Sequence, residues 1–231
     1  MKYFGQQQGE MHKQLSRIIR KIEKIEEAKQ LFLNMHALLH MGAVTHTSKN
    51  EIDQLLSDLK TEEYAIMPTK KDETIAWVLW HTARIEDLTM GILVGQGQQI
   101  FNEAWQKKMN VRIKDTGNAL NDDEIMEFSH QVDIPTLIAY RNEVGKRTQQ
   151  IVSQLQAEDM HRAVSLEGIR QIKETGGVTS QEDSLWLLDY WGSKDVAGLL
   201  LMPPSRHLIM HFNACVKWKQ QIRTRTQFFR Q

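Results

Sequence analysis

The chain has 231 residues, enough for one large domain with a full hydrophobic core, so neither a metal nor a disulfide is needed merely to fold it. Lysine plus arginine and aspartate plus glutamate both total 29, which excludes the strongly basic field typical of proteins that bind nucleic acid or anionic membranes. A single cysteine, a first segment without an apolar leader and no apolar run of about 18 residues favour a cytoplasmic protein without a membrane span.

Apolar residues recur mostly at spacings of three and four, and only four prolines interrupt the chain, so the sequence predicts an all-α fold. The first helix is expected from about residue 10 to the region of Gly42, with Leu15, Ile22 and Phe32 on its apolar face. A shorter amphipathic helix is expected at about 49–60. Pro68 then lies in the loop before the next long helix.

The second long helix is expected at about 72–94. Its buried face includes Trp77 and Ile85, and His81 lies at the centre of that face. Between about 95 and 134, the strings GQGQ, DTGN and NDDE are turn or capping signals around two short helices, near 98–109 and 121–128. We interpret this segment as a helical insertion over one end of the core.

Pro135 begins a third long helix that is expected to reach about residue 157, and a further helical stretch covers 165–175. Pro203, Pro204 and Ser205 suit the first turn of the last helix. Four long helices make a bundle, and because no repeat or linker divides it, residues 1–231 are predicted to form one domain. Exposed helix faces of such a bundle would allow a homodimer.

Three histidines carry the strongest chemical signal. His207 and His211 are four residues apart, which places both imidazoles on one face of the last helix, and His81 faces the core from the second. Any one buried histidine alone is explained by its own hydrogen bonds in the core. Burying three without a shared partner would leave ring nitrogens unpaired, whereas one divalent ion satisfies all of them. The three together therefore predict a metal site.

The strings TIAWVLWHTARIEDLTM and GLLLMPPSRHLIMHFNACVKW resemble the DinB-like (YfiT-like) superfamily, and the resemblance covers essentially the whole chain. It implies a four-helix bundle of up-down-down-up topology, with the insertion between the second and third long helices. It also implies one metal-binding histidine on the second helix and an H-x-x-x-H pair on the fourth, the positions of His81, His207 and His211. Similar bundles include bacillithiol-dependent thiol S-transferases, the metal-binding part of mycothiol-dependent maleylpyruvate isomerase and a domain of ergothioneine-pathway sulfoxide synthases.

The three histidines and this resemblance predict an open divalent-metal site in an enzyme that acts on a small-molecule substrate, such as a low-molecular-weight thiol, by thiol transfer or hydrolysis. Zinc and nickel are favoured, and iron and manganese are further candidates. No motif assigns a catalytic residue. The alternative is a non-catalytic bundle that binds a ligand or partner and holds a structural metal, and four protein ligands would support it.

Three more residues are candidates for the surroundings of the metal. His36 and His40 lie on or beside the buried face of the first helix, so either completes the coordination or, as we favour, both form hydrogen bonds or line the pocket near the metal. Arg84 either fixes an anionic group at the pocket mouth or pairs with a carboxylate such as Asp87 or Glu143, and the pairing is slightly favoured. Cys215 is interpreted as a packed thiol.

Overall fold

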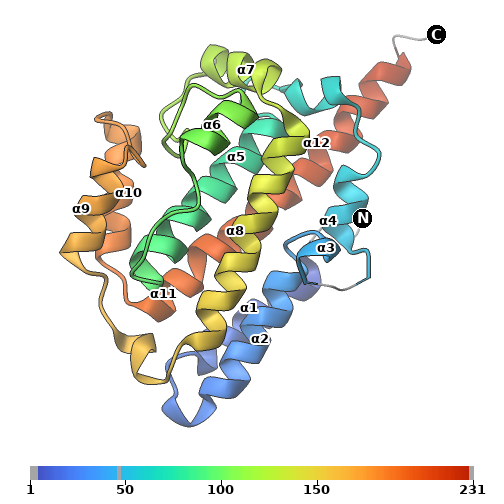
Figure 1. Ribbon diagram of the computed structural model, residues 1–231. Coiled ribbons are helices and arrows are strands. Elements are labelled where there is room, and N and C mark those ends of the chain that lie inside the picture. Colours follow the sequence, from blue (N-terminus) through green and yellow to red (C-terminus); the bar gives the residue numbers. More distant parts are fainter. Residues whose placement is uncertain (1–4, 46–47, 229–231) are drawn as a thin grey trace.

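The computed structural model describes residues 5–45 and 48–228. Within these ranges the chain is helical, and extended pairing is confined to an isolated bridge between Ala163 and Asp195. The fold is therefore all-α, as the apolar spacing predicts (Figure 1).

The α-helices in chain order are α1 (Gln6–Ile18), α2 (Ile25–Ala37), α3 (Gly42–Thr45), α4 (Glu51–Leu56), α5 (Ile75–Glu86), α6 (Glu103–Met109), α7 (Asp122–Gln131), α8 (Ile134–Gln154), α9 (Leu166–Glu174), α10 (Glu182–Gly192), α11 (Val196–Leu200) and α12 (Leu208–Phe228). Short 3-10 turns are η1 (Ile22–Lys24), η2 (Thr61–Ala65) and η4 (Glu158–His161). Two segments are π-helices, namely η3 (Asp87–Val94) and η5 (Met202–His207).

The N-terminal region differs from the single helix expected between residue 10 and Gly42. The helix ends after Ile18, Lys21 takes an extended conformation, and α2 packs back against α1. Ile22, expected in the core, is 61% exposed at this turn. A continuous helix of about 32 residues would be about 48 Å long and would project beyond its neighbours, whereas the hairpin keeps both apolar faces in contact with the bundle.

α5 and η3 form one continuous helix at the centre of the fold, and every residue from 75 to 94 is buried. α8 packs along both segments, η5 and α12 pack on α5, and α2 packs against α8 and η5. Figure 1 shows the teal α5 beside the yellow α8, with the orange-red α12 passing behind α8. A helix that is covered on all sides has no solvent face, so its polar side chains need partners inside the protein.

Local capping explains where the long helices begin. The Thr74 hydroxyl accepts from the backbone N–H of Trp77 at the start of α5, with an O···N distance of 3.0 Å. Asp133 accepts from the backbone N–H of Thr136 at 2.9 Å, and Pro135 occupies the first turn of α8, where a missing N–H is harmless. These signals lie in the sequence itself, which is why the start of α8 falls within one residue of its expected position.

The segment between η3 and α8 covers one end of this central helix. α6 packs on α8, and α7 packs on α5 and η2. A buried polar network connects this segment to the central helix. The Arg84 guanidinium donates to the Lys114 carbonyl, to Asp87 and to the Tyr140 hydroxyl, at 3.0, 3.1 and 3.0 Å. The Tyr140 hydroxyl in turn donates to Asp87 at 2.7 Å, and Asp87 also accepts the backbone N–H of Phe101 at 2.9 Å.

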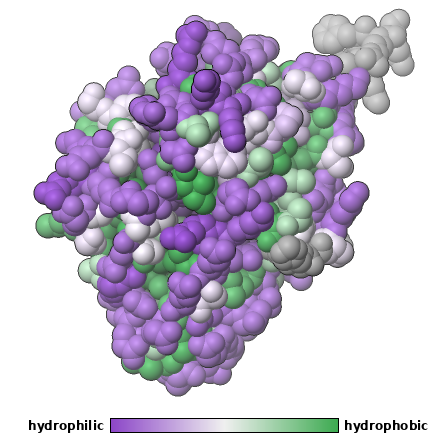
Figure 2. Space-filling view, in the orientation of Figure 1, coloured by the Kyte–Doolittle hydropathy of each residue, from purple (hydrophilic) through white to green (hydrophobic). Residues whose placement is uncertain are grey.

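The surface has the character expected of a protein with its apolar residues inside. Figure 2 shows a face that is mainly hydrophilic, with hydrophobic residues in smaller areas between the hydrophilic ones. Within the described ranges, no helix combines the length and the apolar character required to cross a lipid bilayer.

We expect Tyr140→Phe to lower the free energy of unfolding by about 1 to 3 kcal/mol, because it removes a buried hydroxyl that links Arg84 and Asp87 and leaves both with one bond fewer. Urea unfolding followed by circular dichroism measures this. Tyr190→Phe, at a partly exposed tyrosine on α10, is the matched control and should change stability by less than about 0.5 kcal/mol. Equal effects of the two substitutions would contradict a stabilising role of the network.

Candidate metal centre

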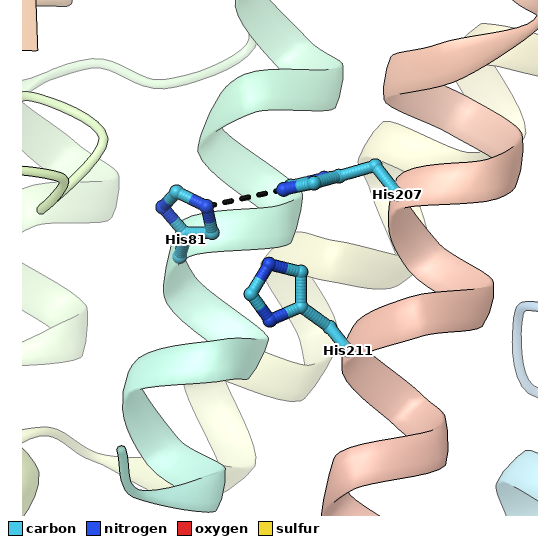
Figure 3. Close-up of side chains that lie close together, drawn as sticks. All are labelled: His81, His207 and His211. Carbon is cyan, nitrogen blue, oxygen red and sulfur yellow. Dashed lines mark hydrogen bonds between the residues drawn. The ribbon is translucent and has the colours of Figure 1, made fainter. Parts of the chain in front are cut away.

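Three histidine side chains from two neighbouring helices converge on one point (Figure 3). His81 lies in the middle of α5, His207 is the last residue of η5, and His211 is in the first turn of α12. The Nε2 atoms of His81 and His207 are 3.2 Å apart, and each of the three rings places one nitrogen within 4.8 Å of the other two. The structure thus brings together the three histidines that the sequence pattern groups.

The π-helix η5 sets the position of His207 and His211. In an α-helix the carbonyl of Leu200 would accept from the N–H of residue 204, but Pro204 has no N–H. The Ser205 hydroxyl takes that place and donates to the Leu200 carbonyl at 2.7 Å. Because a second proline, Pro203, precedes it, two successive backbone bonds are lost and the turn widens before α12 begins.

The ring of His81 is held by its neighbours in a defined orientation. Its Nδ1–H donates to the Thr116 carbonyl at 2.9 Å. The other ring nitrogen, Nε2, therefore carries a lone pair, and this lone pair is directed toward His207. Trp77 stacks on the ring with centroids 4.3 Å apart, and the Trp77 indole N–H donates to the Gly117 carbonyl at 3.0 Å. This arrangement, a ligand histidine fixed by a backbone carbonyl, is typical of metal centres.

The loop that supplies these carbonyls depends on Gly117. Its φ of +72° lies in the left-handed region, and a Cβ there would lie 3.0 Å from the Trp77 indole nitrogen. Trp80 donates to the Asp115 carbonyl of the same loop at 3.0 Å. The DTGN string, recognised in the sequence only as a turn, therefore orients the side chains of the central helix.

Burial keeps the three imidazoles neutral. It lowers the pKa of His81 to about 3, with a further contribution from nearby His211, and it lowers the pKa of His211 to about 4. Burial and the two neighbouring rings lower the pKa of His207 well below its ordinary value. Neutral rings offer lone pairs rather than protons, so the site is in the protonation state that metal binding requires.

The geometry fits a divalent metal ion. Two imidazole nitrogens at about 2.1 Å from one zinc ion, with an angle of about 90° to 109° between them, would lie about 3.0 to 3.4 Å apart. The 3.2 Å between His81 and His207 falls in this range. Within the described residues, the cluster contains these three histidines and no carboxylate or thiolate. Three protein ligands leave coordination positions for other groups, which is typical of catalytic rather than structural sites.

A pocket of about 470 Å³ opens onto the three histidines. Trp77, Leu120 and Ile125 form its apolar wall, and the charged or polar side chains that line it are Lys70, Lys71, Asp72, Glu73, Asn118 and Asp122. The volume suits a small molecule rather than a polymer. The pocket is formed by the loop before α5, the insertion and the last helix, so three distant parts of the chain shape it.

Glu73 is a pocket residue for which the sequence gives no signal. Burial raises the pKa of its carboxyl group, and the carboxylates of Asp72 and Asp122 add to this effect. A carboxyl group with a raised pKa, in a pocket beside a metal centre, is suited to accept and return a proton. Its position depends on the path of the loop before Thr74, which no periodic pattern specifies.

His36 and His40 lie outside this pocket. Their Nε2 atoms bond to the two carboxylate oxygens of Glu86, at 2.8 and 3.1 Å, and all three side chains are fully buried. Neither histidine therefore completes the coordination of the site formed by His81, His207 and His211. Both histidines form hydrogen bonds, as the sequence analysis favours, but their partner is the Glu86 carboxylate on α5 rather than a group in the pocket.

Arg84 and Cys215 are also placed away from the pocket walls. The ion pair expected between Arg84 and Asp87 is present, and the guanidinium binds the insertion rather than the mouth of the pocket. Cys215 is fully buried, and burial raises the pKa of its thiol, so it packs as a neutral side chain in the core.

Comparison with known proteins identifies the family of this chain. Residues 45–182, more than half of the chain, match the family model described as the DinB superfamily. His81 lies inside the matched segment, whereas His207 and His211 follow it. A search of curated proteins finds no match. Because the match covers more than half of the chain, the chain belongs to the DinB superfamily.

Proposed function

We propose that this protein is a divalent-metal-dependent enzyme that acts on a small molecule through an open site formed by His81, His207 and His211. The observation that carries the proposal is the convergence of three neutral imidazoles, without a fourth protein ligand in the described chain, at the end of a pocket. We further propose the up-down-down-up order for α2, α5, α8 and α12, and the course of these helices in Figure 1 supports it.

The residues of the pocket have separable tasks. The three imidazoles hold the metal, zinc or nickel by preference, and the Thr116 carbonyl keeps His81 in the tautomer that binds. A bound divalent cation would supply Lewis acidity and would lower the pKa of a coordinated water or thiol. Glu73, with its raised carboxyl pKa, is placed in the pocket to accept or return a proton, and the apolar wall formed by Trp77 and Ile125 limits the access of water.

A low-molecular-weight thiol is the substrate class that we favour, with thiol transfer ahead of hydrolysis. The resemblance to thiol S-transferases supports this choice. The pocket adds a second argument, because Lys70 and Lys71 at its edge offer cationic groups to the carboxylates that such thiols carry. Cys215 takes no part, since its buried thiol stays protonated.

Metal binding tests the site directly. We expect His207→Ala or His211→Ala to weaken zinc and nickel binding by more than about 100-fold, because the loss of a supporting partner alone weakens metal sites by about 10- to 100-fold. Calorimetric titration of metal-free protein measures the affinity. His130→Ala removes an exposed histidine on α7 and should bind as the wild type does. Unchanged affinity in both site variants would contradict the proposed centre.

The stability of the metal-free protein should fall as the pH drops below about 6.5. His81 and His211 in the unfolded chain titrate near the ordinary histidine pKa of 6.5, but their pKa values in the folded protein are about 3 and about 4. At a pH between the folded and the unfolded pKa, the unfolded chain binds more protons than the folded protein. Each of these histidines therefore lowers the free energy of unfolding by up to about 1.4 kcal/mol for each pH unit by which the pH falls.

Urea unfolding in EDTA at pH 7, 6 and 5 checks this dependence. His81→Gln should reduce the slope, because the variant lacks one of the groups responsible, whereas His130→Gln should keep the slope of the wild type. The expectation is wrong if His81→Gln and the wild type lose stability in parallel.

Turnover tests the reaction class. Zinc- or nickel-loaded protein should accelerate the reaction of bacillithiol or cysteine with monobromobimane, and Glu73→Gln should lower kcat by about 10²- to 10⁴-fold, the usual contribution of a general base, with metal content unchanged. Fluorescence of the bimane adduct follows the rate. Glu62→Gln, the same amide substitution at an exposed glutamate outside the pocket, is the matched control and should keep the kcat of the wild type. A rate that is the same with and without metal would contradict the catalytic proposal.

A further inference from the structure

A second cluster of metal-binding side chains lies inside the bundle, apart from the pocket. His36 and His40 extend from the C-terminal part of α2 and the residues after it, and Glu86 is the last residue of α5. His36 Nε2 is 2.8 Å from Glu86 Oε1, and His40 Nε2 is 3.1 Å from Glu86 Oε2. The three side chains are fully buried, and one donor atom of each lies within 4.8 Å of the other two.

This cluster repeats the layout of the first site on the other side of the central helix. In both, two histidines four residues apart in the chain meet a single residue of α5. His81 and Glu86 are five residues apart, so they point about 140° away from each other around α5 and are separated by about 7.5 Å along it. One helix thus supplies the third donor to two clusters that face different neighbours.

We propose that His36, His40 and Glu86 form a second divalent-metal site. Two imidazoles and one carboxylate are a donor set that suits zinc, manganese and ferrous iron. The carboxylate brings a negative charge that the first site lacks, and a bound cation would gain from it in a buried region of low dielectric constant. The Thr148 hydroxyl, which donates to Glu86 Oε1 at 2.7 Å, holds the carboxylate in place, as partners of metal ligands commonly do.

The surroundings also define the competing state. The separations are those of hydrogen bonds from two imidazoles to a carboxylate, so the cluster has an ion-free arrangement of its own. Arg141 is a buried cation whose charge acts on His40 and Glu86 of this cluster. The guanidinium donates to the Leu39 carbonyl and lies 4.7 Å from the centre of the Phe212 ring, and its charge opposes a metal ion and favours the ion-free state.

Metal content separates the two states. The protein is produced in medium supplemented with zinc, manganese and iron and is purified without chelators, because a buried site is filled as the chain folds. Elemental analysis then gives metal ions per chain. We expect two in the wild type and one in the triple variant His81→Ala, His207→Ala, His211→Ala, which leaves the second cluster untouched. We expect one in Glu86→Gln, where an amide of the same shape replaces the carboxylate.

The outcomes distinguish this inference from the proposed function. One ion in the wild type and none in the triple variant would overturn the second site and leave the first intact. One ion in both would support the second site and remove the first. The triple variant must keep the circular dichroism spectrum of the wild type, and the count is made on folded protein.

Arg141→Met gives an independent readout. Methionine fills a similar volume without charge, so a cation bound to His36, His40 and Glu86 should be retained longer against EDTA in this variant. In the ion-free network the guanidinium instead neutralises Glu86. An unchanged rate of loss of the second ion in Arg141→Met would place that ion away from this guanidinium and would overturn the proposal.

Discussion

The complete burial of the central helix is the constraint on which the rest of the structure depends. A helix without a solvent face leaves no exposed side for polar residues, yet this one carries His81, Arg84, Glu86 and Asp87. Each needs a partner from another element, since an unpaired polar group in the core costs about 1 to 3 kcal/mol and an unpaired charge costs more. The surrounding helices and loops are therefore positioned by these four side chains as well as by apolar packing.

The burial of the central helix makes the same residues important for the stability of the fold and for the metal centre. The insertion supplies the carbonyl of Thr116 to His81 and that of Lys114 to Arg84, so one loop both supports the metal centre and holds the buried cation. Glu86 obtains its partners from α8 and from the histidines at the end of α2 instead. Although burial opposes its ionisation, the neighbouring His40 and His36 hold the pKa of Glu86 well below its usual range, so the centre of the bundle contains a carboxylate anion.

The sequence predicts the parts of this arrangement that depend on local periodicity. The spacing of His207 and His211, and the place of His81 on an apolar face, are enough to identify the three histidines. The periodicity gives no sign that Glu86 is buried, because an amphipathic pattern implies one buried and one exposed face, and this helix is covered on every side. The sequence also gives no sign of Glu73 or of the Thr116 carbonyl, whose positions depend on loop conformation. The break after Ile18 is missed for another reason, since the apolar pattern continues through a turn that packing requires.

The widened turn at η5 has a consequence for how this chain tolerates change. Its proline pair and the bond from Ser205 to the Leu200 carbonyl fix how many residues lie between the end of α11 and His207. Deletion of a single residue there would rotate the following helix by about 100° and shift it by about 1.5 Å, which would turn both imidazoles away from α5. The spacing of this short segment therefore matters more than the identity of most residues within it, and insertions or deletions are expected to be far more damaging here than conservative substitutions.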